Sequence, residues 1–200
     1  MSSQRHLKRR VLTVIVAASL AIVSGCSSSG DSTDRDSSGV HNSADVAFAT
    51  DMMPHHAQAI EMADLALERS GSTAVVNLAE QIKNAQDPEI RKMGETMDDR
   101  GHGMGPRMGS MDKSMAGMMS RADMKRLAHA SGVSFDRMWL TMMVEHHHGA
   151  ISMAKTELSD GDNADAKALA GDIIDGQQVE IATMQGVLQD IDSTVTTLGG

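Results

Sequence analysis

Cysteine, proline and aromatic residues are all scarce in this chain of 200 residues: it has one cysteine, three prolines and only Phe48, Phe135 and Trp139 as aromatics. A single cysteine excludes disulfides within the chain, cysteine-based zinc sites and iron–sulfur clusters, each of which needs several cysteines. Any metal ion must then be held by His, Met, carboxylate or amide groups. With so few aromatics, the 18 methionines must supply much of the core packing.

The N-terminus has the pattern of an export signal. Four basic residues, ending at Arg10, precede an uncharged stretch at 11–23 that is too short to span a bilayer comfortably. The stretch runs into Val23-Ser24-Gly25-Cys26, which resembles the lipobox of bacterial lipoproteins, where the cysteine is lipidated. We expect residues 1–25 to be a lipoprotein signal peptide and Cys26 to anchor the protein to the extracytoplasmic side of a bacterial membrane.

The segment after the cysteine is predicted to be a flexible tether. Residues 26–42 are rich in Ser, Gly and Asp and have almost no large apolar side chains, so they cannot offset the entropy of ordering. Removing residues 1–25 takes away four basic and no acidic residues, which changes the net charge from -9 to -13. So acidic a chain is not expected to bind nucleic acid.

Two segments of the chain repeat one pattern. Residues 52–63 read MMPHHAQAIEMA and residues 142–154 read MMVEHHHGAISMA. When the sequence is shifted by 91 residues, positions 43–93 match their counterparts at 18 of 51 positions without a gap. Such a repeat indicates two copies of one supersecondary unit, each of which needs its partner to bury an apolar face.

Each copy is predicted to be a helical hairpin. Ala, Met, Ile and Leu recur at helical spacing after Ser43 and after Ser134, which we take as N-caps, and Gly71 and Gly161 mark the turns. We expect an all-α four-helix bundle at 43–193 made of two repeated hairpins. Its expected parts are repeat one at 43–100, a Met- and Gly-rich connection at 101–117, a short helix at 120–131 and repeat two at 134–193.

Histidine and methionine share one face of the first helix in each copy. At about 100° per residue, the His-His pair and the methionine three or four positions earlier fall on one side, whereas Gln58 is expected to point away. Side chains at this spacing can bind one ion together. The residues concerned are Met52, His55 and His56 in copy one, and Met143, His146 and His147 in copy two. His148 has no counterpart and is expected on the surface.

The second helix of each hairpin brings further donors to the same height. Antiparallel folding about the turns places Gln86, Glu89 and Met93 beside the first pair and Gln177, Glu180 and Met184 beside the second. We expect the methionines to be ligands, and the Glu and Gln side chains to orient the histidines. Imidazoles with thioethers favour copper, particularly Cu(I), and silver over hard cations such as magnesium.

The connection between the repeats is a weaker candidate for metal binding. This connection and the two residues after it contain His102 and methionines at nearly helical spacing: Met104, Met108, Met111, Met115, Met118 and Met119. The segment is either an apolar flap over the bundle or a tract that collects Cu(I) or Ag(I) and passes the ion to the histidines. Its glycines and proline argue against a stable helix.

The repeated motif is similar to that of the bacterial domain-of-unknown-function family numbered 305. The resemblance covers about residues 44 to 190 and rests on HHxxAIxMA at 55–63, QxxEI at 86–90, GMMS at 117–120 and HHxGAIxMA at 146–154. It implies an exported, ferritin-like protein with two similar two-helix repeats. Some members of that family are associated with copper binding and copper tolerance in the cell envelope, which implies copper here by similarity.

Parts of the sequence also fit two functions other than copper binding. A di-iron enzyme needs a Glu-x-x-His motif on each of two helices, and only Glu145 and His148 have this spacing. No nucleophile-and-base pair or phosphate-binding loop is present, so we do not expect an enzyme. The alternative is an interaction module without metal, in which the histidines and Glu89 and Glu180 form structural hydrogen bonds or sense pH. As a copper protein, the chain is expected to buffer the ion or pass it to another envelope protein.

Overall fold

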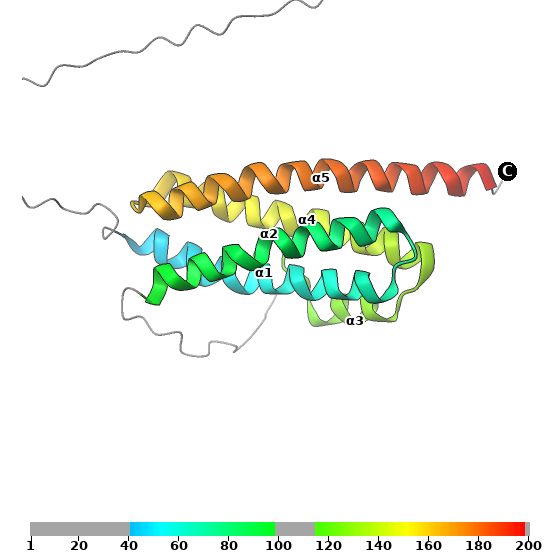
Figure 1. The fold of residues 1–200 in the computed structure, drawn as a ribbon, viewed down its shortest axis with the longest axis horizontal. Coiled ribbons are helices and arrows are strands. Elements are labelled where there is room, and N and C mark those ends of the chain that lie inside the picture. The colour runs from blue at the N-terminus through cyan, green and yellow to red at the C-terminus, as the bar shows by residue number, and fades with distance from the viewer. Residues whose placement is uncertain (1–40, 99–114, 199–200) are drawn as a thin grey trace, which may run out of the picture. The chain divides into compact units, whose positions relative to one another are not determined.

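The computed structural model describes residues 41–98 and 115–198, which form five α-helices and no strand. They are α1 (Ser43–Arg69), α2 (Thr73–Asp98), α3 (Arg121–His129), α4 (Gly132–Asp160) and α5 (Ala164–Leu198) (Figure 1). The signal peptide, Cys26 and nearly all of the tether predicted from the sequence lie outside the described residues. None of the described helices has the length and hydropathy needed to cross a membrane.

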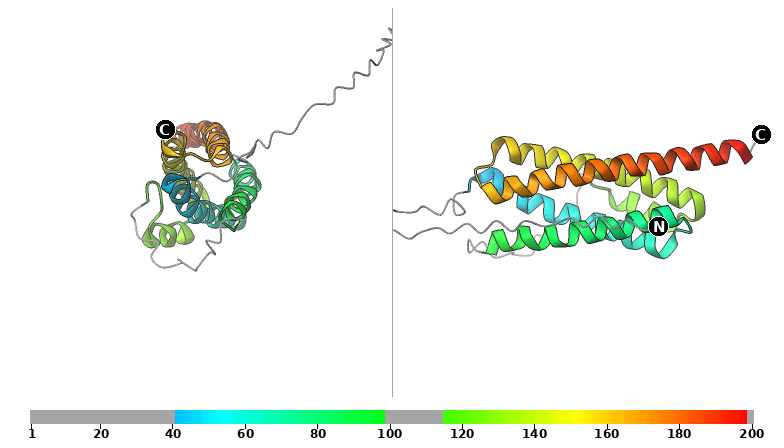
Figure 2. Two further views of the ribbon diagram at one scale, coloured as in Figure 1. Left: turned by 90° about the vertical axis from the view of Figure 1, so that its left-hand side faces the viewer. Right: turned by 45° about the horizontal axis from the view of Figure 1, so that its top comes forward.

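The four long helices form a bundle of two hairpins. α1 packs along α2 and α4 packs along α5, and the hairpins meet mainly through α1 and α4, with a smaller contact between α2 and α5. An end-on view shows the four helices around a common centre, with α3 outside them (Figure 2). The all-α four-helix bundle of repeated hairpins expected from the sequence is confirmed.

The helix ends differ in detail from the predicted ones. Asn42, not Ser43, is the N-cap of α1, and its side chain accepts hydrogen bonds from the backbone N–H groups of Ala44 and Asp45. α4 begins at Gly132, two residues before the predicted cap, and α5 continues past residue 193. The short helix agrees with prediction, because Ser120 caps α3 in a capping box with Asp123.

Equivalent aspartates of the two repeats fasten the ends of the bundle. Asp45 at the start of α1 accepts a hydrogen bond from the backbone of Asn163 at 2.9 Å, and Asp136 in α4 accepts one from the Ser70 hydroxyl at 2.5 Å. Each first helix thereby binds the turn of the other hairpin. Glu157 is buried beside Asp45, and burial together with that carboxylate raises the pKa of Glu157 to about 7.

The core consists of two apolar clusters built mostly from Met, Ala, Ile and Leu. One contains Trp139 and surrounds the turn of α1–α2, and the other contains Phe48 and surrounds the turn of α4–α5. The Trp139 indole N–H donates to the Met62 carbonyl at 2.8 Å, which satisfies the buried donor. Buried histidine and glutamine side chains on α1, α2, α4 and α5 separate the two clusters.

Candidate metal centre

Four histidines from the two repeats lie at one level of the bundle. His55 and His56 on α1 and His146 and His147 on α4 are completely buried, with 0% of each residue exposed. The rings of His55 and His146 are in contact, with 3.8 Å between their centroids and 41° between their planes. The two pairs therefore form one cluster, which we call the histidine core.

Glutamates from the second helix of each hairpin hold one histidine of each pair. The Nε2 atom of His56 lies 2.7 Å from Oε2 of Glu89, and Nε2 of His147 lies 2.7 Å from Oε2 of Glu180. An ionised carboxylate can only accept, so each Nε2 carries the proton that is donated. In a neutral imidazole, the other nitrogen, Nδ1, then has the lone pair. That the two glutamates orient ligating histidines stays a prediction.

Five imidazole nitrogens of the histidine core have no hydrogen-bond partner among the described residues: Nδ1 of His55, His56, His146 and His147, and Nε2 of His146. The side-chain amides of Gln86 and Gln177 are also buried and without a partner. Buried polar atoms are rarely left in this state unless they bind something. Neutral imidazole lone pairs gathered in a buried layer fit a metal ion of borderline or soft character.

Burial also keeps the two contacting rings neutral. It lowers the pKa of His55 to about 3, against the opposing effect of the hydrogen bond with the Ala116 carbonyl. It lowers the pKa of His146 well below its usual value, and the neighbouring His55 and His147 add to this effect. Protons therefore do not compete for these nitrogens near neutral pH.

The predicted methionine ligands border the histidine core on both sides. Met52 and Met93 belong to the cluster around the turn of α4–α5, whereas Met143 and Met184 belong to the other, and all four are at most 1% exposed. Met52 and Met143 each lie three positions before the first histidine of their pair and four before the second, which is about one helical turn. The two methionines of each hairpin thus belong to one apolar cluster, and their role as metal ligands stays a prediction.

No three His, Asp or Glu side chains of the described segments converge as ready-made ligands of one ion. The imidazoles alone are therefore not a preformed chelate. An ion held here needs a thioether from the bordering methionines or a rotation of the rings about their side-chain torsions.

Residues 115–119, which we call the strap, close the histidine core on one side. The Ala116 carbonyl lies 3.1 Å from Nε2 of His55. Gln58 donates to the Met119 carbonyl at 2.9 Å and accepts from the Met119 N–H at 2.7 Å. We expected Gln58 to point away from the face that His and Met share; it is nevertheless 1% exposed, because the strap covers that side of α1.

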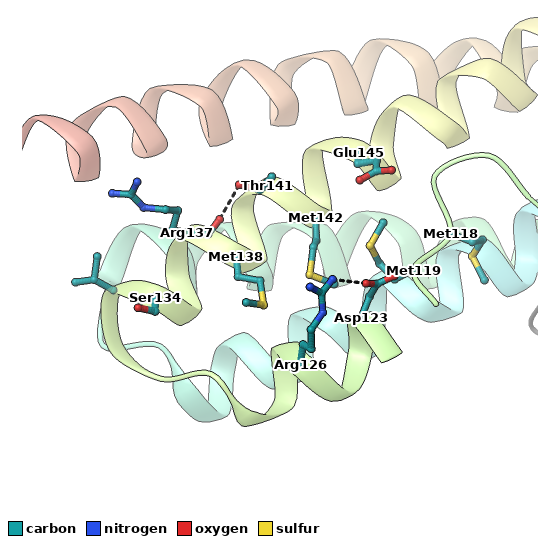
Figure 3. Close-up of a pocket in the computed structure, with 11 residues that line it drawn as sticks. Met118, Met119, Asp123, Arg126, Ser134, Arg137, Met138, Thr141, Met142 and Glu145 are labelled. Atoms are coloured by element: carbon teal, nitrogen blue, oxygen red, sulfur yellow. Dashed lines mark hydrogen bonds and ion pairs between the residues drawn. The ribbon is translucent and has the colours of Figure 1, made fainter. Parts of the chain in front are cut away.

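The strap also supplies part of the predicted accessory tract. Met118 and Met119 are 8% and 7% exposed, and they line a cavity of about 900 Å³ together with Met138 and Met142 of α4 (Figure 3). Met115 is half-buried, and His102, Met104, Met108 and Met111 lie outside the described residues. Sequence reasoning missed the two α4 methionines, although they precede His146 by eight and four positions on one helical face.

The residues that suggested a di-iron site do not join the histidine core. Glu145 and His148 are both exposed, Glu145 at the edge of the cavity and His148 on the surface as expected.

A comparison with known protein families identifies the relationship of this chain. The family model described as Domain of unknown function (DUF305) matches residues 45–188.

The chain belongs to the DUF305 family. A crystal structure of a DUF305 fragment from Deinococcus radiodurans is 32% identical with a TM-score of 0.68, covering 74% of this chain and 97% of the other. A DUF305 protein of Streptomyces coelicolor that is proposed to be secreted is also 32% identical, with a TM-score of 0.68, covering 75% of this chain and 94% of its own.

Another similar structure carries a metal. CopM in the Cu(II)-bound form is 30% identical with a TM-score of 0.65, covering 73% of this chain and 96% of CopM. CopM is also similar to this chain in its Cu(I)-bound and silver-bound forms. No curated protein sequence matches this chain.

Proposed function

We propose that this protein binds copper as Cu(I), and silver as its analogue, in the histidine core. The observation that carries the proposal is the set of five buried imidazole nitrogens without partners, bordered by four buried methionines. The similarity to CopM, whose structures hold Cu(I), Cu(II) and silver, supports the choice of metal.

In this proposal, the histidines, methionines and glutamates have different roles in holding the ion. Nδ1 of His56 and of His147 offer lone pairs, while His55 and His146 contribute from the centre of the cluster. Thioethers of Met52, Met93, Met143 and Met184 add the soft donors that Cu(I) prefers. Glu89 and Glu180 fix the tautomer of their histidines and increase the basicity of the free nitrogen.

The proposed role is buffering or transfer of copper, not catalysis, in the cell envelope. The sequence pattern at Cys26 suggests a lipid anchor outside the cytoplasm, and the relative from Streptomyces coelicolor that is proposed to be secreted supports an extracytoplasmic location. Another envelope copper protein would then deliver or receive the ion. Complete burial of the core suits storage, because the bound ion is shielded from solvent and from reactants.

A competition titration tests the proposal. The folded domain and a colorimetric Cu(I) chelator share the metal, and the affinity is compared with that of a variant whose four core histidines are alanine. His148→Ala is the matched control, because this adjacent histidine is exposed. We expect the core variant to lose most of its affinity and the control to keep it. Equal binding by all three folded proteins would disprove the histidine site.

One observation favours a second function. The bonds of His56 with Glu89 and of His147 with Glu180 also suit a structural layer that specifies how the hairpins pack, in a module that binds another protein. A ligand that binds only the folded state must raise its stability. A melting temperature unchanged by Ag(I) would therefore favour this alternative.

A further inference from the structure

The cavity beside the strap is lined by an unusual set of side chains. Met138 and Met142 of α4 and Met119 of the strap are directed toward the space between α3 and α4 (Figure 3). Met119 and Met142 belong to the apolar cluster that contains Trp139, and Met138 packs against it, but all three also line about 900 Å³ of accessible space. Sulfur atoms are thus available to a small ligand here.

The two arginines that line the cavity are each paired with an aspartate. Arg126 forms an ion pair with Asp123, and Arg137 forms one with Asp192 at 2.6 Å. The carboxylate of Glu145 lies at the rim and is exposed. The cavity therefore does not carry the net positive charge that would repel a monovalent cation.

The cavity adjoins the histidine core at two places, through Met142 of α4 and through the strap. Met142 precedes His146 by one helical turn, so their side chains are neighbours along α4. The strap, whose Met119 lines the cavity, contacts His55 through the Ala116 carbonyl. Because every core histidine is 0% exposed, an ion from solvent must pass the side chains or backbone that cover them, and the strap and α4 are part of that cover.

We propose that this cavity is a second, transient site for Cu(I) or Ag(I), in which Met119, Met138 and Met142 bind the ion before it moves to the histidine core. The transfer step rests on the proposed function, whereas binding in the cavity does not. Thioethers without imidazole or thiolate bind soft monovalent ions weakly enough to release them, and they discriminate against Zn(II). The ion changes ligands without any change of oxidation state.

Binding is tested first on the unaltered protein. Methionine methyl groups labelled with ¹³C are observed by NMR while Ag(I) is added past one equivalent, because the first equivalent fills the tighter histidine core. Met138→Leu and Met142→Leu variants assign the two resonances. We expect both resonances to shift with Ag(I) and to stay in place with Zn(II). If Ag(I) leaves them unmoved, or Zn(II) shifts them equally, the cavity is not a soft-metal site.

Transfer is tested by kinetics. Met138 and Met142 are replaced together by leucine, which keeps similar volume, and Met53→Leu with Met153→Leu is the control because these methionines are half-buried outside the cavity. We expect the rate of Ag(I) transfer from a chelator to fall about tenfold in the cavity variant, with equilibrium affinity unchanged. An unchanged rate in a variant whose melting temperature matches the control would overturn the transfer step.

The two proposals fail separately. If the alanine variant of the histidine core binds as tightly as the unaltered protein while Ag(I) still shifts the Met138 and Met142 resonances, the histidine site fails and the cavity site stands. If histidine-dependent affinity is confirmed and the resonances do not move, the cavity site alone is wrong.

Discussion

Replacing Gly149 by alanine should detach the strap from α4. A Cβ atom at this position would lie 2.0 Å from the Ala116 carbonyl oxygen and 2.8 Å from Cα of Gly117. Both contacts are below 3.0 Å and both involve backbone atoms, so no side-chain rotation relieves them. The strap must therefore shift as a unit.

The loss of stability follows from the hydrogen bonds that anchor the strap. Three hydrogen bonds hold it to α1: one between His55 and the Ala116 carbonyl, and two between Gln58 and the Met119 backbone. At about 0.5 to 1.5 kcal/mol each, their loss lowers the free energy of unfolding by about 1.5 to 4.5 kcal/mol. The Met119 amide proton, released from Gln58, should also exchange faster with solvent.

Denaturant unfolding followed by circular dichroism measures the change, and hydrogen exchange reports on the Met119 amide. Gly176→Ala is the matched control, since a Cβ at this exposed position in α5 meets nothing within 4 Å. There the substitution should raise the free energy of unfolding by about 0.5 to 1 kcal/mol, because alanine favours helix. A Gly149→Ala protein as stable as the unaltered one, with its Met119 amide still protected, would refute the reasoning.

Three further variants have expected outcomes. Glu89→Gln with Glu180→Gln should weaken Cu(I) binding roughly 10- to 100-fold in a chelator competition, because neutral amides orient and polarise the histidines less; unchanged affinity would count against their role. Because the folded protein holds the pKa of Glu157 at about 7, above the usual 4.5, it favours the protonated carboxyl and loses stability as pH rises from about 4.5 through 7. Glu157→Gln should thus raise the free energy of unfolding by about 1 to 3 kcal/mol at pH 8 and leave it nearly unchanged near pH 4.5; a gain equal at both pH values would contradict this assignment. Trp139→Phe removes the indole donor to the Met62 carbonyl and should cost about 1 to 3 kcal/mol in urea unfolding.

The fold was largely predictable because the repeat is local in sequence and strong. Equivalent positions such as Leu78 and Leu169 repeat the same helical pattern, and two amphipathic hairpins leave few ways to bury their faces. The pairing of His56 with Glu89 was also predictable, because a short turn sets the heights of facing residues in an antiparallel hairpin. Helix ends were less certain, since Asn42 and Ser43 are both good N-caps.

Features that depend on contacts between distant segments were not predictable. The contact of His55 with His146 depends on how one hairpin docks on the other, so the sequence left open whether the two sites merge. Gln58 is buried by the strap, which lies about sixty residues along the chain, and helical periodicity describes only the face turned to other helices. Met138 was missed for a related reason, since its cavity forms between α4 and a short helix.

A crystal structure of the Ag(I)-loaded protein, with the metal located by its anomalous scattering, tests the central claim most directly. The histidine core predicts a silver ion bound by imidazole nitrogens of the cluster around His55 and His146, with a bordering methionine sulfur among its ligands. Silver found only in the cavity or at exposed residues such as His148, with the core histidines unchanged, would contradict it.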